Sequence, residues 1–331
     1  MIPMLDKQVR TELAGQHRLL ARANAVTPQP EIQSALRDVD AALDRVAHGT
    51  FGICDVCHEE IEAERLEHDP LALSCGIHPS PAELARLQRD LTLARRVQRS
   101  LLPEPHGFLQ GWEYRYRYEA AGDVGGDFCD VLPLPHRGET LIVVGDVSGK
   151  GVAASLLMSS LLATFRSLAS VGVPAGEMLS RVNGLFHDTT SPAAYATLTA
   201  AVLRPGGDVD LYSAGHWPPL LRRSRQIEPL SIEVGLPIGL FKDAVYEPTP
   251  VTLTPADTLL FYTDGAIDAE NGFGEEFSRQ RLADALAADA GDGLHALVDR
   301  CATDVKRFRN GRPAGDDTLL FAISARPAFR P

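Results

Sequence analysis

The chain has 331 residues, a formal net charge of −12 and 44% apolar residues. This length exceeds the usual size of a single domain, so we expect two domains. The negative charge argues against nonspecific binding to nucleic acid or to an anionic membrane surface. We expect no membrane-spanning run and no secretory signal, and therefore a cytoplasmic protein. Five cysteines, three of them clustered, fit metal binding under reducing conditions better than a disulfide framework.

Two segments near the N-terminus have helical apolar spacing, residues 5–24 and residues 31–47. The turn Thr27–Pro30 separates them. The pattern predicts a helical hairpin. A single amphipathic hairpin of this length is marginal alone and needs a partner to pack on.

The next motif is Cys54-x2-Cys57-x17-Cys75-x2-His78, which has the ligand spacing of a structural zinc site. Two close pairs separated by a loop let four ligands close a tetrahedron around one Zn²⁺. The surrounding segment, GTFGICDVCHEEIEAERLEHDPLALSCGIH, resembles the zinc finger of the DksA/TraR family, which also follows a helical hairpin. The resemblance departs at His78, where a fourth cysteine is usual. The alternative is a degenerate finger that has lost its metal.

In the DksA/TraR family the acidic tip of the hairpin reaches into RNA polymerase. Here the corresponding tip, residues 24–33, contains Glu31 as its one acidic residue. A role at RNA polymerase therefore does not carry over. We interpret residues 1–79 as a regulatory or dimerising module.

Residues 80–103 are predicted to form a linker helix. A stripe of residues at alternating spacings of three and four runs along it. The stripe has two interpretations of equal weight: a short coiled-coil seam that would make a homodimer, or a face that docks on the following domain. Its members are Leu84, Leu87, Leu91, Ala94, Gln98 and Leu101.

Aspartates stand at the ends of strand-like segments in three places. Aspartate is seldom fully buried unless it is paired or bound to a metal, so such turns point to ligation. Taken singly, each turn is more often structural, since Asp-Gly is the commonest turn dipeptide. The residues are Asp127 and Asp130 before the strand-like run 140–144, Asp146 after it, Asp264 after the run 258–263, and Asp316 and Asp317 before the run 318–323.

Several carboxylates of this kind suit a hard divalent cation such as Mg²⁺ or Mn²⁺. Two such ions roughly 3.5–4 Å apart can share a hydroxide and direct it in line at a phosphorus. Other phosphate chemistries fit less well. The segment GDVSGKG at 145–151 is one residue short of a P-loop and has Gly151 in place of its Ser or Thr. Cys301 and Arg307 have the C-x5-R spacing of a cysteine phosphatase, but the residues between them include no glycine.

Six motifs follow one another in the second part of the chain: GGDFCD (125–130), GDVSGKG (145–151), SAGHWPPLL (213–221), GLPIGL (235–240), FYTDGAIDAEN (261–271) and GDDTLL (315–320). Their order and spacing resemble bacterial metal-dependent serine/threonine phosphatases of the PP2C superfamily, SpoIIE/RsbU branch. The resemblance implies an α+β fold for residues 104–331, an αββα sandwich of two mostly antiparallel sheets with helices outside. It also implies a metal site at one edge of the sandwich.

The resemblance also implies roles for individual residues. Asp146, helped by the backbone carbonyl of Val147, would bridge two Mn²⁺ or Mg²⁺ ions. Asp264 and one of the pair Asp316 and Asp317 would complete the second ion, and Asp127 would hold the first. The catalytic set is thus Asp127, Asp146 and Asp264.

Three further residues have two interpretations each. Arg115 and Arg117, on a strand-like segment, are either phosphate clamps or solvated strand-face residues. His216, in the turn after residue 214, is either a general acid for the leaving serine or a turn histidine bonded to nearby backbone. Residues 94–103 resemble the linker helix that, in relatives, transmits signals to the metal site.

These patterns predict a protein serine/threonine phosphatase regulated through its zinc module. By resemblance, its substrate is a phosphorylated STAS-type anti-anti-sigma protein, and no direct contact with nucleic acid or membrane is expected. Two alternatives remain: a catalytically silent scaffold with a phosphatase fold, and a transcription regulator of the DksA type.

Overall fold

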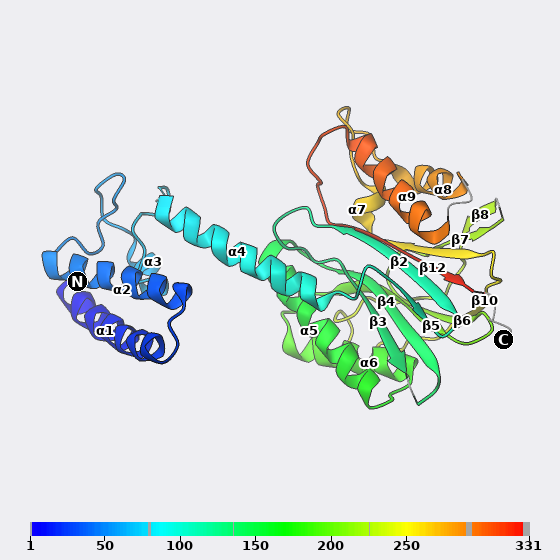
Figure 1. The fold of residues 1–331 in the computed structure, drawn as a ribbon, viewed down its shortest axis with the longest axis horizontal. Coiled ribbons are helices and arrows are strands. Elements are labelled where there is room, and N and C mark those ends of the chain that lie inside the picture. Colours follow the sequence, from blue (N-terminus) through cyan, green and yellow to red (C-terminus); the bar gives the residue numbers. More distant parts are fainter. Residues whose placement is uncertain (1, 79–80, 135, 225, 289–292, 327–331) are drawn as a thin grey trace. The chain divides into compact units, whose positions relative to one another are not determined.

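A computed structural model describes residues 2–78, 81–134, 136–224, 226–288 and 293–326. The chain forms two units, Met1–Leu91 and Thr92–Pro331 (Figure 1). The division falls inside the predicted linker helix. The predicted boundary between residues 79 and 80, and the last five residues of the predicted phosphatase domain, lie outside the described residues.

The first unit contains a helical hairpin and a small second core. Helices α1 (Ile2–Val26) and α2 (Pro30–His48) lie side by side (Figure 1). Their contact includes Leu13 of α1 and Val39 of α2, which are almost fully buried. Helix α2 ends at Gly49, which takes a positive φ of 69° that favours glycine. The second core surrounds the short helix α3 (Ala63–His68) and includes two of the predicted zinc ligands.

Helix α4 (Pro81–Leu101) begins in the first unit and ends in the second. In the first unit, Arg86 forms a 2.9 Å ion pair with Asp69. In the second unit, Leu101 packs against the hydrophobic core.

The structure supports the docking interpretation for the C-terminal part of the α4 stripe, and the dimer seam stays a prediction. Gln98 is 4% exposed and Leu101 docks on the second unit, whereas Leu84 is 51% exposed and Leu87 is 56% exposed.

The second unit is built on two sheets packed face to face (Figure 1). Among the strands of the described residues, neighbouring pairs are antiparallel except β6 and β9, which are parallel. One sheet has the order β1 (His106–Leu109), β2 (Trp112–Glu119), β12 (Thr318–Ala325), β11 (Thr258–Tyr262), β7 (Leu220–Arg223) and β8 (Gln226–Pro229). The other has the order β10 (Thr249–Thr252), β6 (Asp208–Ala214), β5 (Ala196–Leu203), β4 (Glu139–Val147) and β3 (Phe128–Leu134), with β9 (Val234–Gly235) beside β6.

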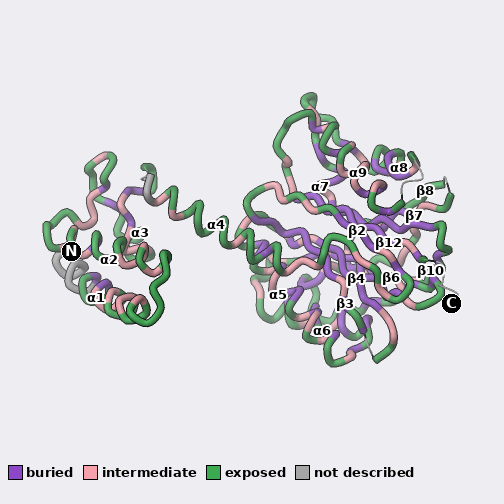
Figure 2. The backbone as a smooth tube through the Cα atoms, viewed as in Figure 1, coloured by how far each residue is buried: buried purple, intermediate pink, exposed green. Residues whose placement is uncertain are grey.

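Three hydrophobic cores account for the layers, and the buried stretches follow the strands (Figure 2). Between the sheets, aromatic residues of β2 stack on Phe321 of β12, with ring centroids 5.7 and 6.0 Å apart. Helices α5 (Gly151–Ser170) and α6 (Ala175–Thr189) cover one outer face. Helices α7 (Asp264–Ile267), α8 (Ser278–Ala287) and α9 (Gly293–Arg309) cover the other. The predicted αββα sandwich is confirmed.

Helix α5 is the one described helix with the length and apolar composition of a membrane span. The expectation that no apolar run reaches that length was therefore wrong on these two criteria. The helix buries Met158, Leu161, Leu162 and Phe165 in the core it shares with the sheet. An apolar helix of this kind is also what the covered face of a sheet requires.

Candidate active site

The predicted site aspartates come together from both sheets. Asp127 immediately precedes β3, and Asp146 lies near the end of β4. Asp264 begins α7, with Thr263 between it and the end of β11, and Asp316 and Asp317 immediately precede β12. Because β4 and β11 belong to different sheets, the group spans the two layers of the sandwich. Asp127, Asp146, Asp264 and Asp316 are called the carboxylate cluster below.

Burial and mutual repulsion define the electrostatics of the carboxylate cluster. Burial, and next the charge of Asp146, raise the pKa of Asp127 well above its usual range. Burial, and next the charges of Asp264 and Asp316, raise the pKa of Asp146 to about 7. Burial and the charge of Asp316 also raise the pKa of Asp264. Desolvated carboxylates that repel one another are stabilised by a bound cation, so these residues fit a divalent metal.

The structure distinguishes Asp317 from Asp316. One carboxylate oxygen of Asp317 accepts a hydrogen bond from the Ala121 amide at 2.8 Å, and the other accepts one from the Gly126 amide at 2.6 Å. A Cβ atom on Gly125 would overlap this carboxylate, so the backbone approach requires glycine. Asp317 therefore fastens the loop that leads to Asp127. Asp316 is half-buried and belongs to the carboxylate cluster.

The backbone carbonyl of Val147 faces the same space as the Asp146 carboxylate. A Cβ atom on Gly126 would lie 2.7 Å from the Val147 oxygen and 2.9 Å from Oδ1 of Asp146. The Val147 carbonyl oxygen and the Asp146 carboxylate oxygen thus lie on either side of the space next to the Gly126 backbone. Because residue 126 is glycine, no side chain fills that space.

Two polar residues that the sequence analysis did not single out support the cluster. The Thr263 hydroxyl, fully buried, donates to Oδ2 of Asp127 at 2.7 Å and accepts from the Leu319 amide at 2.9 Å. Gln98 of α4 donates to the Gly125 carbonyl at 2.6 Å and accepts from the Gly125 amide at 3.2 Å. The one available signal for Gln98 was a polar side chain within an apolar stripe.

The other candidates are engaged elsewhere. Arg115 and Arg117 both bind Asp299 of α9, at 3.1 and 2.6 Å, and so join β2 to that helix. Asp130 lies outside the carboxylate cluster because it pairs with Arg166 at 2.7 Å.

His216 is buried, and one ring nitrogen lies 2.8 Å from the Thr197 hydroxyl. Burial lowers the pKa of His216 to about 4, so its imidazole is neutral near pH 7. The other ring nitrogen has no hydrogen-bond partner among the described residues. The backbone of Tyr262 also acts on the ring and opposes the effect of burial on its pKa, so the contacts with side chain and backbone favour a structural turn histidine.

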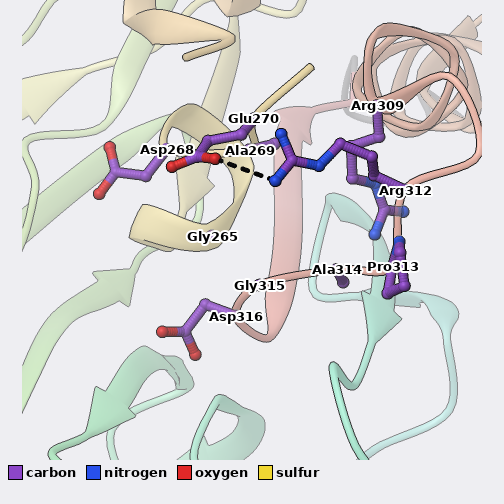
Figure 3. Close-up of a pocket in the computed structure, with 10 residues that line it drawn as sticks. All are labelled: Gly265, Asp268, Ala269, Glu270, Arg309, Arg312, Pro313, Ala314, Gly315 and Asp316. Carbon is purple, nitrogen blue, oxygen red and sulfur yellow. Dashed lines mark ion pairs between the residues drawn. The ribbon is translucent and has the colours of Figure 1, made fainter. Parts of the chain in front are cut away.

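A pocket adjoins the carboxylate cluster at Asp316 (Figure 3). Its volume is about 290 Å³, and acidic and basic side chains both line it. Arg312 pairs with Glu270 across it at 3.5 Å. Arg309 also lines the pocket, and its guanidinium binds Glu119 at 2.9 Å. The pocket is large enough to hold one amino-acid side chain beside Asp316.

The four predicted zinc ligands of the first unit also come together. One ligand atom each from Cys54, Cys57, Cys75 and His78 lies within 4.8 Å of all the others. The sulfur atoms of Cys57 and Cys75 are 3.8 Å apart, and Cys75 Sγ is 3.3 Å from His78 Nδ1. A tetrahedral Zn²⁺ with Zn–S distances of about 2.3 Å separates its sulfur ligands by about 3.8 Å. Hydrogen bonds, first from the Cys57 amide, lower the pKa of Cys54 to about 6, which favours the thiolate that zinc binds.

The characterised relatives that sequence comparison finds include three that are each 27% identical to this chain. Protein IcfG of Synechocystis sp. matches over 262 residues, which cover 71% of this chain and 41% of that protein. Phosphoserine phosphatase RsbP of Bacillus subtilis matches over 246 residues, 72% of this chain and 58% of the relative. Phosphoserine phosphatase RsbU of Bacillus subtilis matches over 200 residues, 59% of each. The chain thus spans about half the length of the characterised relatives it matches.

Solved structures with the same fold include the SiaA-PP2C domain of Pseudomonas aeruginosa, with a TM-score of 0.63 and 21% identity over 74% of this chain and 98% of that one. The RsbU and RsbW domains of a Mycobacterium tuberculosis protein give a TM-score of 0.56 and 28% identity over 66% and 61%. The profile of one family matches residues 136–326, which is more than half of the sequence. The chain therefore belongs to the Stage II sporulation protein E (SpoIIE) family.

Proposed function

We propose that this protein is a Mn²⁺- or Mg²⁺-dependent protein serine/threonine phosphatase. The observation that carries the proposal is the carboxylate cluster, in which burial and neighbouring carboxylates raise the pKa of Asp127, Asp146 and Asp264, an arrangement that a divalent cation would stabilise. Membership of the SpoIIE family and the relatives named phosphoserine phosphatases support it. A silent scaffold has no need of three desolvated carboxylates grouped with a fourth at one edge of the fold, so the cluster favours an enzyme.

Each residue of the site has a proposed task. Asp146 and the Val147 carbonyl hold both metal ions, Asp127 holds the first, and Asp264 and Asp316 complete the second. Bound there, the ions would supply an activated water and neutralise the phosphoryl oxygens. Thr263 orients Asp127 through its 2.7 Å hydrogen bond. Asp317 keeps Gly126 and the Asp127 loop against the end of β4, and is a positioning residue in this proposal.

The proposal is tested by hydrolysis of a phosphoserine peptide with Mn²⁺, with Mg²⁺ and with EDTA. We expect turnover with either ion and none with EDTA. The same assay on residues 92–331 reveals an enzyme that the first unit holds inactive. Absence of metal-dependent turnover in both proteins would refute the phosphatase.

For the physiological substrate, we propose a phosphoserine or phosphothreonine on a STAS-type anti-anti-sigma protein. The support is the resemblance to the RsbU and RsbP relatives. The cytoplasm is the proposed location. The proposed zinc module, with one Zn²⁺ on Cys54, Cys57, Cys75 and His78, would regulate the enzyme through α4.

Gln98 connects α4 to the loop before Asp127 through its hydrogen bonds with Gly125. We expect Gln98→Leu to weaken Mn²⁺ binding about tenfold, because the buried amide and carbonyl of Gly125 both lose their partner. Calorimetric titration with Mn²⁺ measures the change. Arg96→Gln, an exposed position on the same helix, is the matched control and should retain wild-type affinity. Wild-type affinity in Gln98→Leu would exclude this coupling.

The exposed part of the α4 stripe is the proposed homodimer seam. Leu84 and Leu87 present two large apolar side chains one helical turn apart. We expect the double variant Leu84→Gln/Leu87→Gln to shift a dimer towards monomer in light scattering, with the helix content of the protein unchanged. A monomeric wild type at micromolar concentration would contradict the dimer and leave the phosphatase proposal intact.

A further inference from the structure

Lys150 lies at the edge of the carboxylate cluster, in the glycine-rich turn between β4 and α5. Gly149 and Gly151 on either side take positive φ angles of 103° and 69°, which favour glycine. The turn thereby directs the lysine towards the segment before β12. Its ammonium lies 2.8 Å from Oδ2 of Asp316 and 2.7 Å from the Gly315 carbonyl oxygen.

The neighbouring arginines have other partners. Arg309 binds Glu119, and Arg312 is paired with Glu270. Figure 3 shows the Asp316 carboxylate pointing away from both of these arginines. Lys150 is therefore the counter-ion of Asp316 in this structure.

The position of Lys150 also suits an incoming phosphate ester. Its side chain is 65% exposed, so a phosphate ester in solution can reach the ammonium. Lysine binds phosphate as a flexible point charge and needs no amide cradle. GDVSGKG is one residue short of a P-loop, but that spacing is needed only where backbone amides surround the phosphate. The segment can therefore still bind phosphate through its lysine.

We propose that Lys150 exchanges partners: it pairs with Asp316 while the metal site is empty, and binds a phosphoryl oxygen of the phosphate monoester once a divalent ion has taken Asp316. The inference rests on the proposed phosphatase function. It gives Lys150 two opposite effects. The residue competes with the metal for Asp316 and strengthens the binding of phosphate.

Lys150→Met tests both effects because it removes the charge and keeps the length of the side chain. In calorimetric titration without substrate, we expect Mn²⁺ to bind about two- to fivefold more tightly than to wild type, the usual range for an exposed ion pair. In the hydrolysis assay, we expect the inhibition constant of inorganic phosphate to rise about tenfold, because a charge-assisted hydrogen bond is lost.

Two control variants define the outcome. Lys150→Arg keeps the charge and should stay close to wild type in both measurements. Lys242→Met removes a lysine that pairs with Asp188 at 2.8 Å outside the cluster, and should change neither. Unchanged or weaker Mn²⁺ binding in Lys150→Met would refute the competition between Lys150 and the metal for Asp316. An unchanged inhibition constant for phosphate would refute the binding of phosphate by Lys150. If wild type neither binds Mn²⁺ nor hydrolyses substrate, the phosphatase proposal itself fails.

Discussion

Replacing Asp146 by Asn should lower Mn²⁺-dependent hydrolysis at least about a thousandfold, because the residue proposed to hold both ions loses its charge. The fold should survive, since Asn has the same shape. The metal-free protein should even become more stable near neutral pH. The pKa of Asp146 in the folded state, about 7, lies above its value in the unfolded chain. As pH rises from the unfolded value to the folded one, ionisation of Asp146 therefore lowers the free energy of unfolding. Steady-state kinetics and thermal unfolding with EDTA measure the two effects.

The neighbouring pair Asp316 and Asp317 provides the control for this result. Asp316→Asn should weaken Mn²⁺ binding and leave the melting temperature of the metal-free protein close to that of wild type. Asp317→Asn should lower that temperature, because the Ala121 and Gly126 amides lose a charged acceptor. The reverse pattern would make Asp317 the ligand. An Asp146→Asn protein with wild-type turnover would exclude the proposed metal site.

The second large effect is expected in the first unit on loss of zinc. Cys75→Ser should abolish stoichiometric zinc and unfold the segment between residues 51 and 78. The buried core of this segment has five members, Cys54, Ile61, Leu66, Ala72 and Cys75, and two of these are ligands. Zinc binding contributes roughly 10–16 kcal/mol in finger peptides, far more than so small a core. Metal analysis and hydrogen exchange measure the loss.

His68→Gln is the matched control for the zinc experiment. His68 is exposed and its ring lies 2.8 Å from the carbonyl oxygen of Glu64, away from the four ligands. The zinc content of the His68→Gln protein should stay at one ion per chain. Slow hydrogen exchange in β11 and β12 should persist in Cys75→Ser, because these strands belong to separate cores. A wild type that contains no zinc would identify a finger that has lost its metal.

The layered fold and the members of the carboxylate cluster were predicted mainly through the resemblance of six ordered motifs to the SpoIIE/RsbU branch. Local patterns contributed the observation that aspartates stand at the ends of strand-like runs. The ion-pair partners of Asp130 and Arg115 could be identified only from the structure. Their partners, Arg166 and Asp299, are 36 and 184 residues away along the chain, a separation that no local pattern encodes.

The sequence also could not show that Asp316 and Asp317 have different contacts. Adjacent residues before a strand point in different directions, and which one meets the Gly126 amide depends on how β12 pairs with β2 and β11. The roles of Thr263 and Gln98 at the site were missed for the same reason. Each is an ordinary residue in its own element, and each gains its role from a partner more than 25 residues away.

The close packing around Asp317 has a consequence for how the protein tolerates mutation. A Cβ atom on Gly125 would overlap the Asp317 carboxylate, and one on Gly265 would overlap the Asp317 backbone carbonyl. Alanine at either glycine, a change of one methyl group, must displace the same aspartate. The positions with the narrowest choice of side chain in this region thus include two glycines, which contribute no side chain to the site. In natural variants, these two glycines and Asp317 should change together or not at all.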